Sequence, residues 1–278
     1  MFQTIVTAEQ LNQHLNHSDW VVFDCRFNLM DTDAGFADYQ AGHIPGAFYL
    51  HLDNDLSSDI TPETGRHPLP DPLKLSSALS AAGVSTHTQV VVYDDCGGAM
   101  AARAWWLLKW LGHDEVAVLD GGFSAWTSQY PVDNRIPEAE AAEFDTQLRN
   151  TMNLSVDELQ SELSDAGILL VDARAAERFR GEVEPIDPVA GHVPGAANRP
   201  LTDNLDNGRF KSFEQLKSEW LELLQGQSAD SVVHMCGSGV TACHNLLAME
   251  IAGLKGSRVY SGSWSEWIRD PARPVAKG

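Results

Sequence analysis

The sequence predicts an α/β fold made of two tandem domains, each a mostly parallel sheet flanked by helices. One observation behind this prediction is that an ordered set of motifs occurs twice in the 278 residues. The other is that apolar, strand-like runs alternate with helical segments within each half, as in βαβ units. With 43% hydrophobic residues, a chain of this length can bury two separate cores.

Five motifs recur in the same order in both halves. A capping box opens an amphipathic helix. An apolar strand ending in Asp-x-Arg follows, then a Gly-His-x-Pro-Gly-Ala turn, a second apolar strand, and a segment that ends in Trp. The paired segments are 7–10 with 155–158, 21–26 with 169–174, 42–47 with 191–196, 89–94 with 231–235, and 120–126 with 261–267. An internal duplication explains this order.

The two copies also set the expected domain boundaries. Residues 137–143 and the stretch that follows them lack apolar periodicity, which is typical of a connection. We therefore expect one domain at residues 1–135, a linker at 136–153, and a second domain at 154–278.

The second half contains a cysteine in a setting that favours chemistry. Cys236 follows the apolar strand at 231–235 and is followed by a small-residue loop containing Gly237 and Gly239. Apolar residues at helical spacing come next, so the loop opens a helix. Backbone N–H groups at such a turn favour an anion, and a cysteine placed there is expected to have a lowered pKa and to act as a nucleophile.

The register of the repeat predicts that the first half lacks this nucleophile. Aligning Trp126 with Trp267 places Cys236 opposite Asp95 rather than opposite Cys96. The first half is then a degenerate copy that supports the second. A one-residue slip would instead place Cys96 at the equivalent position.

Composition excludes several classes of function. The chain has 19 Lys and Arg against 39 Asp and Glu, and its net charge of −20 would repel nucleic acid and anionic membranes. The N-terminus does not resemble a signal peptide and no run is long enough to span a membrane, so we expect a cytoplasmic protein. The cysteines form no CxxC pair, and we expect no metal, no disulfide framework and no cofactor. They are Cys25, Cys96, Cys236 and Cys243.

These motifs together resemble the two-domain rhodanese-type sulfurtransferases, most closely the 3-mercaptopyruvate group, over essentially the whole chain. The active loop of that group reads Cys-Gly-Ser-Gly-Val-Thr, as residues 236–241 do here. The resemblance implies that Cys236 takes a sulfane sulfur from a small donor as a persulfide and passes it to cyanide, a small thiol or thioredoxin. It also implies that the rest of the loop binds the donor, namely Gly237, Gly239, Val240 and Thr241.

The same resemblance implies roles for residues outside the loop. Arg178 would bind the donor's carboxylate, for which a guanidinium is suited by its paired donors. Ser238, His67 and Asp53 would together protonate the departing enolate. Arg178 could instead form only a salt bridge, His67 could be a solvated loop residue, and Asp53 could be a helix cap.

One position departs from the family pattern. A second arginine is expected soon after the Glu184-Pro185 segment, but Ile186 and Asp187 stand there. The carboxylate clamp is therefore expected to be incomplete. We expect that an arginine at position 187 would lower the KM for a carboxylate donor.

Three competing functions can be weighed from the residues. A cysteine phosphatase needs an arginine six residues after the cysteine, where this chain has Ala242. A non-catalytic binding module suits the first half, but the intact loop at Cys236 argues against it for the whole chain. A thiosulfate-specific enzyme would carry cations after the cysteine, whereas Gly237 and Ser238 are neutral, which favours a monocarboxylate donor.

Overall fold

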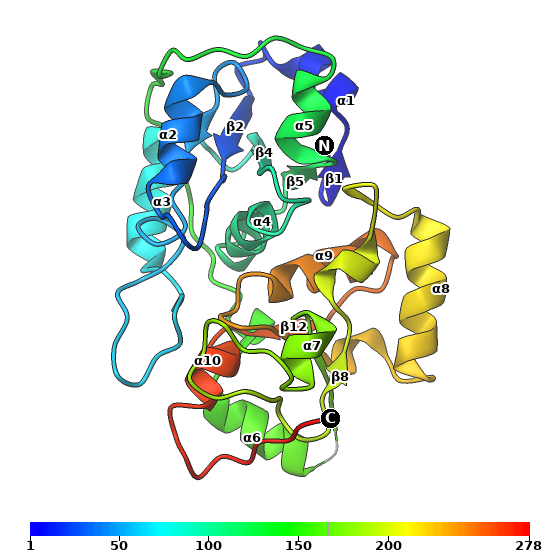
Figure 1. Cartoon of the computed structure of the whole chain (residues 1–278). Coiled ribbons are helices and arrows are strands. Elements are labelled where there is room, and N and C mark those ends of the chain that lie inside the picture. Colours follow the sequence, from blue (N-terminus) through cyan, green and yellow to red (C-terminus); the bar gives the residue numbers. More distant parts are fainter. Residues whose placement is uncertain (166) are drawn as a thin grey trace. The chain divides into compact units, whose positions relative to one another are not determined.

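The computed structural model of the chain describes residues 1–165 and 167–278, which form two compact units (Figure 1). Unit 1 comprises Met1–Ser58, Leu69–Arg149 and Asn207–Phe210, and unit 2 comprises Asp59–Pro68, Asn150–Asp206 and Lys211–Gly278. The division is not linear in the sequence. Residues 59–68 belong to unit 2, and the stretch expected to be a linker is largely part of unit 1, where Gln147 N donates to Leu111 O at 2.8 Å.

Unit 1 is a five-stranded parallel sheet with helices around it. In order across the sheet, its strands are β1 (Ile5–Val6), β5 (Val116–Leu119), β4 (Gln89–Tyr93), β2 (Trp20–Asp24) and β3 (Phe48–Tyr49). Its helices are α1 (Ala8–His14), α2 (Ala34–Ala41), α3 (Pro72–Ala81), α4 (Ala101–Trp110) and α5 (Gly122–Thr127). Short strand β10 (Arg209–Phe210) also belongs to this unit.

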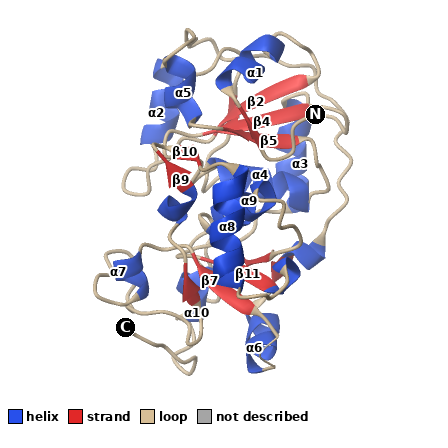
Figure 2. Ribbon diagram, turned by 90° about the vertical axis from the view of Figure 1, so that its right-hand side faces the viewer, coloured by secondary structure: helices blue, strands red, loops and turns tan. Residues whose placement is uncertain are grey.

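Strand β4 is buried along its whole length, as a central parallel strand requires. Its alternate residues Val91 and Tyr93 belong to one core cluster with Leu11 of α1 and Trp126 of α5. Helix α4 packs against β4 and β5. Figure 2 shows the strands of unit 1 running between α1 on one side and α4 on the other.

Unit 2 repeats this topology, so the predicted fold class is confirmed. In order across the sheet, its strands are β6 (Asn153–Leu154), β12 (Arg258–Tyr260), β11 (Val232–Met235), β7 (Leu169–Asp172) and β8 (Ala197–Asn198). Its α-helices are α6 (Val156–Ser164), α7 (Ala176–Phe179), α8 (Phe213–Leu224), α9 (Ala242–Ile251) and α10 (Ser263–Trp267). Its other elements are η1 (Asn150–Met152), η2 (Leu201–Asn204), η3 (Ala229–Ser231) and β9 (Leu205–Asp206).

The repeated motifs have the same structural roles in both units. The predicted capping boxes form at Thr7 and at Ser155. In unit 2, Arg174 of the Asp-x-Arg motif donates to Asp172 at 2.7 Å and to the carbonyl of Gly191 at 2.8 Å. This ties the end of β7 to the Pro-Gly turn. His192 of that turn stacks on the ring of Phe179 and forms a hydrogen bond with its carbonyl, so its role is structural.

In the part of the chain that the structure describes, no helix is both long enough and apolar enough to cross a bilayer.

The core of unit 2 contains a histidine whose burial lowers the stability of the folded protein at acid pH. His234 of β11 is fully buried, and its Nε2 lies 3.2 Å from Ser257 Oγ. Burial lowers the pKa of His234 to about 3. The unfolded chain binds this proton near pH 6.5 and the folded chain does not. Stability is therefore complete above that pH and falls as the pH drops toward 3.

We expect His234→Gln to reduce this acid sensitivity. Between pH 6.5 and about 5, the wild type should lose about 2 kcal/mol of unfolding free energy through this group, at about 1.4 kcal/mol per pH unit, and the variant should not. Urea unfolding at a series of pH values measures the difference. His87→Gln is the matched control because His87 is exposed. Identical pH profiles for His234→Gln and the wild type would contradict the expectation.

Candidate active site

The loop between β11 and α9 holds Cys236 in a fixed, buried position. Its side chain is 1% exposed. The backbone N–H of Cys236 donates to Ser263 Oγ at 3.0 Å, and its carbonyl accepts from Trp264 N at 3.0 Å. The N–H of Gly239 donates to Cys236 Sγ at 3.1 Å. The loop therefore supplies a backbone donor to the sulfur, as the sequence pattern predicts.

Gly239 is required by the backbone of this loop. Its φ is +80°, in the left-handed region, and a Cβ built there would lie 2.1 Å from the carbonyl oxygen of Ser261. The rest of the predicted loop follows the same turn. Val240 is buried and Thr241, half-buried, directly precedes α9.

His67 and Ser238 meet inside unit 2. His67 Nδ1 lies 2.7 Å from Ser238 Oγ, and both side chains are buried. His67 is therefore not a solvated loop residue. It reaches Ser238 because residues 59–68 pack against α10, where Arg66 N donates to Ser265 Oγ at 3.0 Å.

Asp53, the third residue of the predicted set, belongs to unit 1. Its N–H donates to His51 Nδ1 at 3.1 Å, and burial raises the pKa of its carboxyl group. Its partnership with His67 stays a prediction.

Arg178 lies on the short helix α7 and pairs with two carboxylates. Its Nη2 is 2.7 Å from Glu184 Oε1 and 3.3 Å from Asp187 Oδ2. The salt bridges considered in the sequence analysis therefore exist. They do not remove Arg178 from the loop, because a Cβ built on Gly237 would lie 3.7 Å from its Nη1 and Nη2.

A second guanidinium, which the sequence analysis missed, lies at the same place. Arg66 Nη1 pairs with Asp187 Oδ1, and a Cβ built on Gly237 would lie 3.0 Å from Arg66 Nη2. The sequence analysis considered only the segment after Glu184 when it looked for a second arginine, and so it did not consider Arg66. The sequence feature that could have revealed Arg66 is its position directly before His67, which was already a predicted site residue.

The predicted register between the two loops also needs a correction. Tyr93 pairs with Asp24 across the sheet as Met235 pairs with Asp172. The residue opposite Cys236 is therefore Asp94, not Asp95. The first-half loop is one residue longer before its helix begins, so an alignment on the later Trp residues shifts the strand by one position.

Cys96 is not the counterpart of Cys236, as predicted. It lies two positions beyond Asp94, and the residue as a whole is exposed. Its thiol is nevertheless desolvated by the surrounding loop, and this desolvation, together with the carboxylates of Asp94 and Asp95, raises the pKa of Cys96 well above its ordinary value. It therefore remains a thiol, a poor nucleophile, near neutral pH.

Asp94 fills the anion position of the first-half loop. Its carboxylate accepts four backbone N–H groups at 2.8–3.0 Å, from Cys96, Gly98, Met100 and Ala101. The side chain is fully buried. The first loop therefore holds the carboxyl group of an aspartate where the second loop holds the sulfur of a cysteine.

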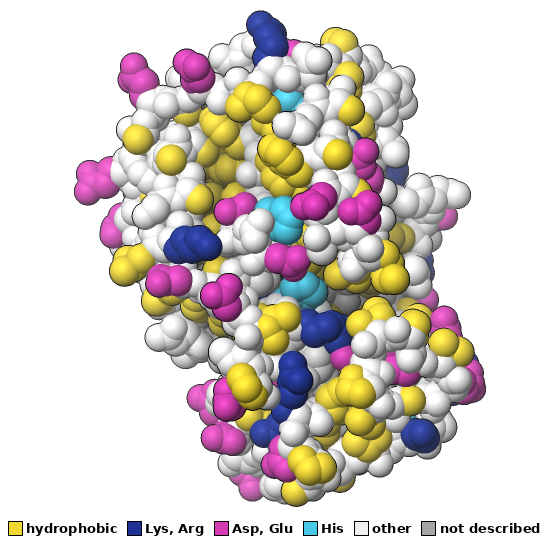
Figure 3. All heavy atoms as spheres, turned by 60° about the vertical axis from the view of Figure 1, so that its left-hand side comes forward, with side chains coloured by type: hydrophobic (Ala, Val, Ile, Leu, Met, Phe, Trp, Pro, Cys, Tyr) yellow, Lys and Arg dark blue, Asp and Glu magenta, His cyan; other side chains and the backbone are white. Residues whose placement is uncertain are grey.

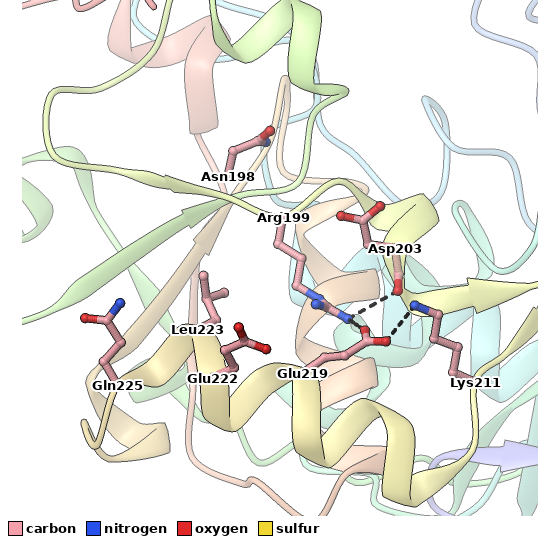
Figure 4. Close-up of a pocket in the computed structure, with 8 residues that line it drawn as sticks. All are labelled: Asn198, Arg199, Asp203, Lys211, Glu219, Glu222, Leu223 and Gln225. Atoms are coloured by element: carbon pink, nitrogen blue, oxygen red, sulfur yellow. Dashed lines mark hydrogen bonds and ion pairs between the residues drawn. The ribbon is translucent and has the colours of Figure 1, made fainter.

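A hollow of about 500 Å³ elsewhere in unit 2 contains none of the predicted site residues (Figure 4). Arg199 and Lys211 line it, and both pair with Glu219, at 2.7 and 2.8 Å. Both cations are thus already paired with a carboxylate, and no cysteine is among the described residues that line this hollow.

Comparison with known proteins finds relatives over nearly the whole chain. The rhodanese-like domain family matches residues 7–129 and again 155–270, so the chain belongs to that family. A Pseudomonas aeruginosa protein named "Probable 3-mercaptopyruvate sulfurtransferase" is 50% identical over 99% of this chain and 98% of its own. Thiosulfate sulfurtransferase of Gallus gallus is 34% identical over 83% of this chain and 80% of its own.

A solved structure extends the comparison. SseA of Escherichia coli, described among the 3-mercaptopyruvate sulfotransferases, superposes with a TM-score of 0.82 at 30% identity, covering 95% of this chain and all of its own. The protein is accordingly an enzyme of the sulfurtransferase class.

Proposed function

We propose that this enzyme transfers the sulfur of 3-mercaptopyruvate through a persulfide on Cys236 to a thiol acceptor such as thioredoxin, or to cyanide. The observation that carries the proposal is the grouping around one buried sulfur. A backbone donor from Gly239 lies at Sγ, the His67–Ser238 pair flanks the loop, and two guanidiniums adjoin Gly237.

In the first half-reaction, the thiolate of Cys236 attacks the donor's sulfur. An S–S bond forms and the donor's C–S bond breaks, and the electron pair of that bond leaves on carbon as the enolate of pyruvate. In this proposal Ser238 protonates the carbon and is resupplied by His67, whose Nδ1 lies 2.7 Å from Ser238 Oγ. The proposed role of Asp53 is to polarise His67.

In the second half-reaction, the acceptor attacks the outer sulfur of the persulfide. The S–S bond breaks and Cys236 leaves as a thiolate, which returns the enzyme to its starting state. The Gly239 N–H stabilises negative charge on Cys236 Sγ at both ends of the cycle. No cofactor is needed for either step.

The alternative donor is thiosulfate, which would use the same persulfide with sulfite as the leaving group. Its double negative charge would need cations in the loop itself, where Gly237 has no side chain and Ser238 is neutral. Figure 3 shows acidic side chains spread over one face of the molecule, with basic side chains gathered near the middle of its lower part. The overall charge of −20 also repels a dianion.

We expect kcat/KM for 3-mercaptopyruvate to exceed that for thiosulfate by at least about tenfold, which corresponds to roughly 1.4 kcal/mol. Steady-state rates with both donors and one common acceptor measure the ratio. A clear preference for thiosulfate would replace the proposed donor with the alternative.

A further inference from the structure

Asp187 occupies a position between two arginines that resembles that of a bound ligand carboxylate. Its Oδ1 pairs with Arg66 Nη1 and its Oδ2 lies 3.3 Å from Arg178 Nη2, so each oxygen has its own guanidinium. The side chain is only 3% exposed, whereas those of Arg66 and Arg178 are 25% and 17% exposed. The arginines can therefore be reached from solvent more easily than the carboxylate that they hold.

This pair of guanidiniums lies next to the residue that follows Cys236. Both adjoin Gly237, the residue that follows Cys236, at 3.0 Å from a Cβ built there for Arg66 and 3.7 Å for Arg178. A side chain at position 237 would intrude on them, and glycine leaves the space open. A donor whose sulfur reaches Cys236 would thus have a carboxylate a few bonds away within range of both arginines.

Arg66 and Arg178 are not available to a donor carboxylate in this structure, because resident carboxylates already balance their charges. Arg174 is already paired with Asp172 at 2.7 Å and with Glu184 at 3.4 Å, and Arg178 pairs with Glu184 and Asp187. Each guanidinium is therefore matched by a carboxylate. A further carboxylate entering this cluster would add an uncompensated negative charge unless one resident carboxylate gave up its partners.

We propose that Arg66 is the second guanidinium that binds the donor's carboxylate, and that Asp187 is a tethered competitor that holds Arg66 and Arg178 until the donor displaces it. The inference rests on the proposed function for the identity of the donor. Asp187 then sets the affinity for carboxylate donors and favours ligands whose carboxylate can engage both arginines. Burial raises the pKa of Asp187, which eases its release.

The test is equilibrium binding of pyruvate, the monocarboxylate product, to protein in which Cys236→Ser prevents chemistry. Adding Asp187→Asn should tighten pyruvate binding about tenfold, because the competing charge is removed and the shape is kept. Adding Arg66→Ala or Arg178→Ala should weaken it about tenfold or more. In protein that also carries Arg66→Ala, Asp187→Asn should tighten pyruvate binding much less, because Asp187 and Arg66 interact directly. Asp187→Ser repeats the removal of charge should Asp187→Asn fold poorly.

Arg180→Ala is the matched control. Arg180 directly follows α7 but is exposed and pairs with Glu182, which is also exposed, so pyruvate binding should not change. If Arg66→Ala binds pyruvate as tightly as its parent, or if Asp187→Asn does not bind it more tightly, the inference is overturned. Undetectable pyruvate binding in every variant, Asp187→Asn included, also overturns it.

Turnover separates this inference from the proposed function. If the wild type transfers sulfur from 3-mercaptopyruvate but Arg66→Ala leaves both its KM and pyruvate binding unchanged, only the inference fails. If pyruvate binding follows the expected pattern but 3-mercaptopyruvate is not a donor, the proposed function fails and the carboxylate site stands.

Discussion

Replacing Cys236 with serine is expected to lower sulfur transfer at least about a thousandfold with either donor, because a hydroxyl cannot form the persulfide. The fold should survive, since serine has nearly the same shape and the loop is fixed by bonds from its backbone to Ser263 and Trp264. Mass spectrometry of the wild type after incubation with donor alone should find one extra sulfur atom on the peptide that contains Cys236.

Cys96→Ser is the matched control for this experiment. Cys96 is exposed and its pKa is raised, so it should neither gain sulfur nor affect the rate. Loss of activity in Cys96→Ser together with full activity in Cys236→Ser would reverse the assignment of the nucleophile.

Replacing His67 with alanine is expected to lower kcat for 3-mercaptopyruvate about a hundredfold and to affect any thiosulfate turnover far less. The reason is the leaving group, since the enolate of pyruvate needs a proton and sulfite is already a stable anion. Ser238→Ala should show the same donor dependence. Because His67 and Ser238 are 2.7 Å apart, the double variant should lose little more than the worse single variant.

Two further measurements distinguish proton delivery from a structural role. His87→Ala, at an exposed histidine, should leave both donors unaffected. Thermal unfolding of His67→Ala should remain close to that of the wild type. Equal losses with both donors would mean that His67 only supports the loop.

Much of the fold could be read from the sequence because local patterns repeat. Capping boxes, Asp-x-Arg strand ends and Pro-Gly turns each depend on neighbouring residues, and each recurs in the same order. The Cys236 loop was predictable for the same reason. A strand, a glycine-containing turn and a helix follow one another directly in the chain.

The features that could not be predicted depend on contacts between residues far apart in the sequence, which local sequence patterns do not indicate. Arg66 and His67 lie in a segment without periodicity, between stretches that belong to unit 1, yet this segment packs with unit 2. Nothing local to Arg66 indicates that Asp187, 121 positions away, holds it. The register error arose similarly, because one additional loop residue before α4 is invisible to an alignment on a later tryptophan.

The carboxylate of Asp94 gives the duplicated chain two loops whose backbone amides have different partners. In the first, four amides donate to a carboxylate that belongs to the chain, so these hydrogen bonds depend on no bound group. In the second, the Gly239 amide donates to the sulfur that, in the proposed mechanism, changes its charge and substitution in each turnover. That mechanism would couple this hydrogen bond to the state of the reaction and would leave those of the first loop unchanged.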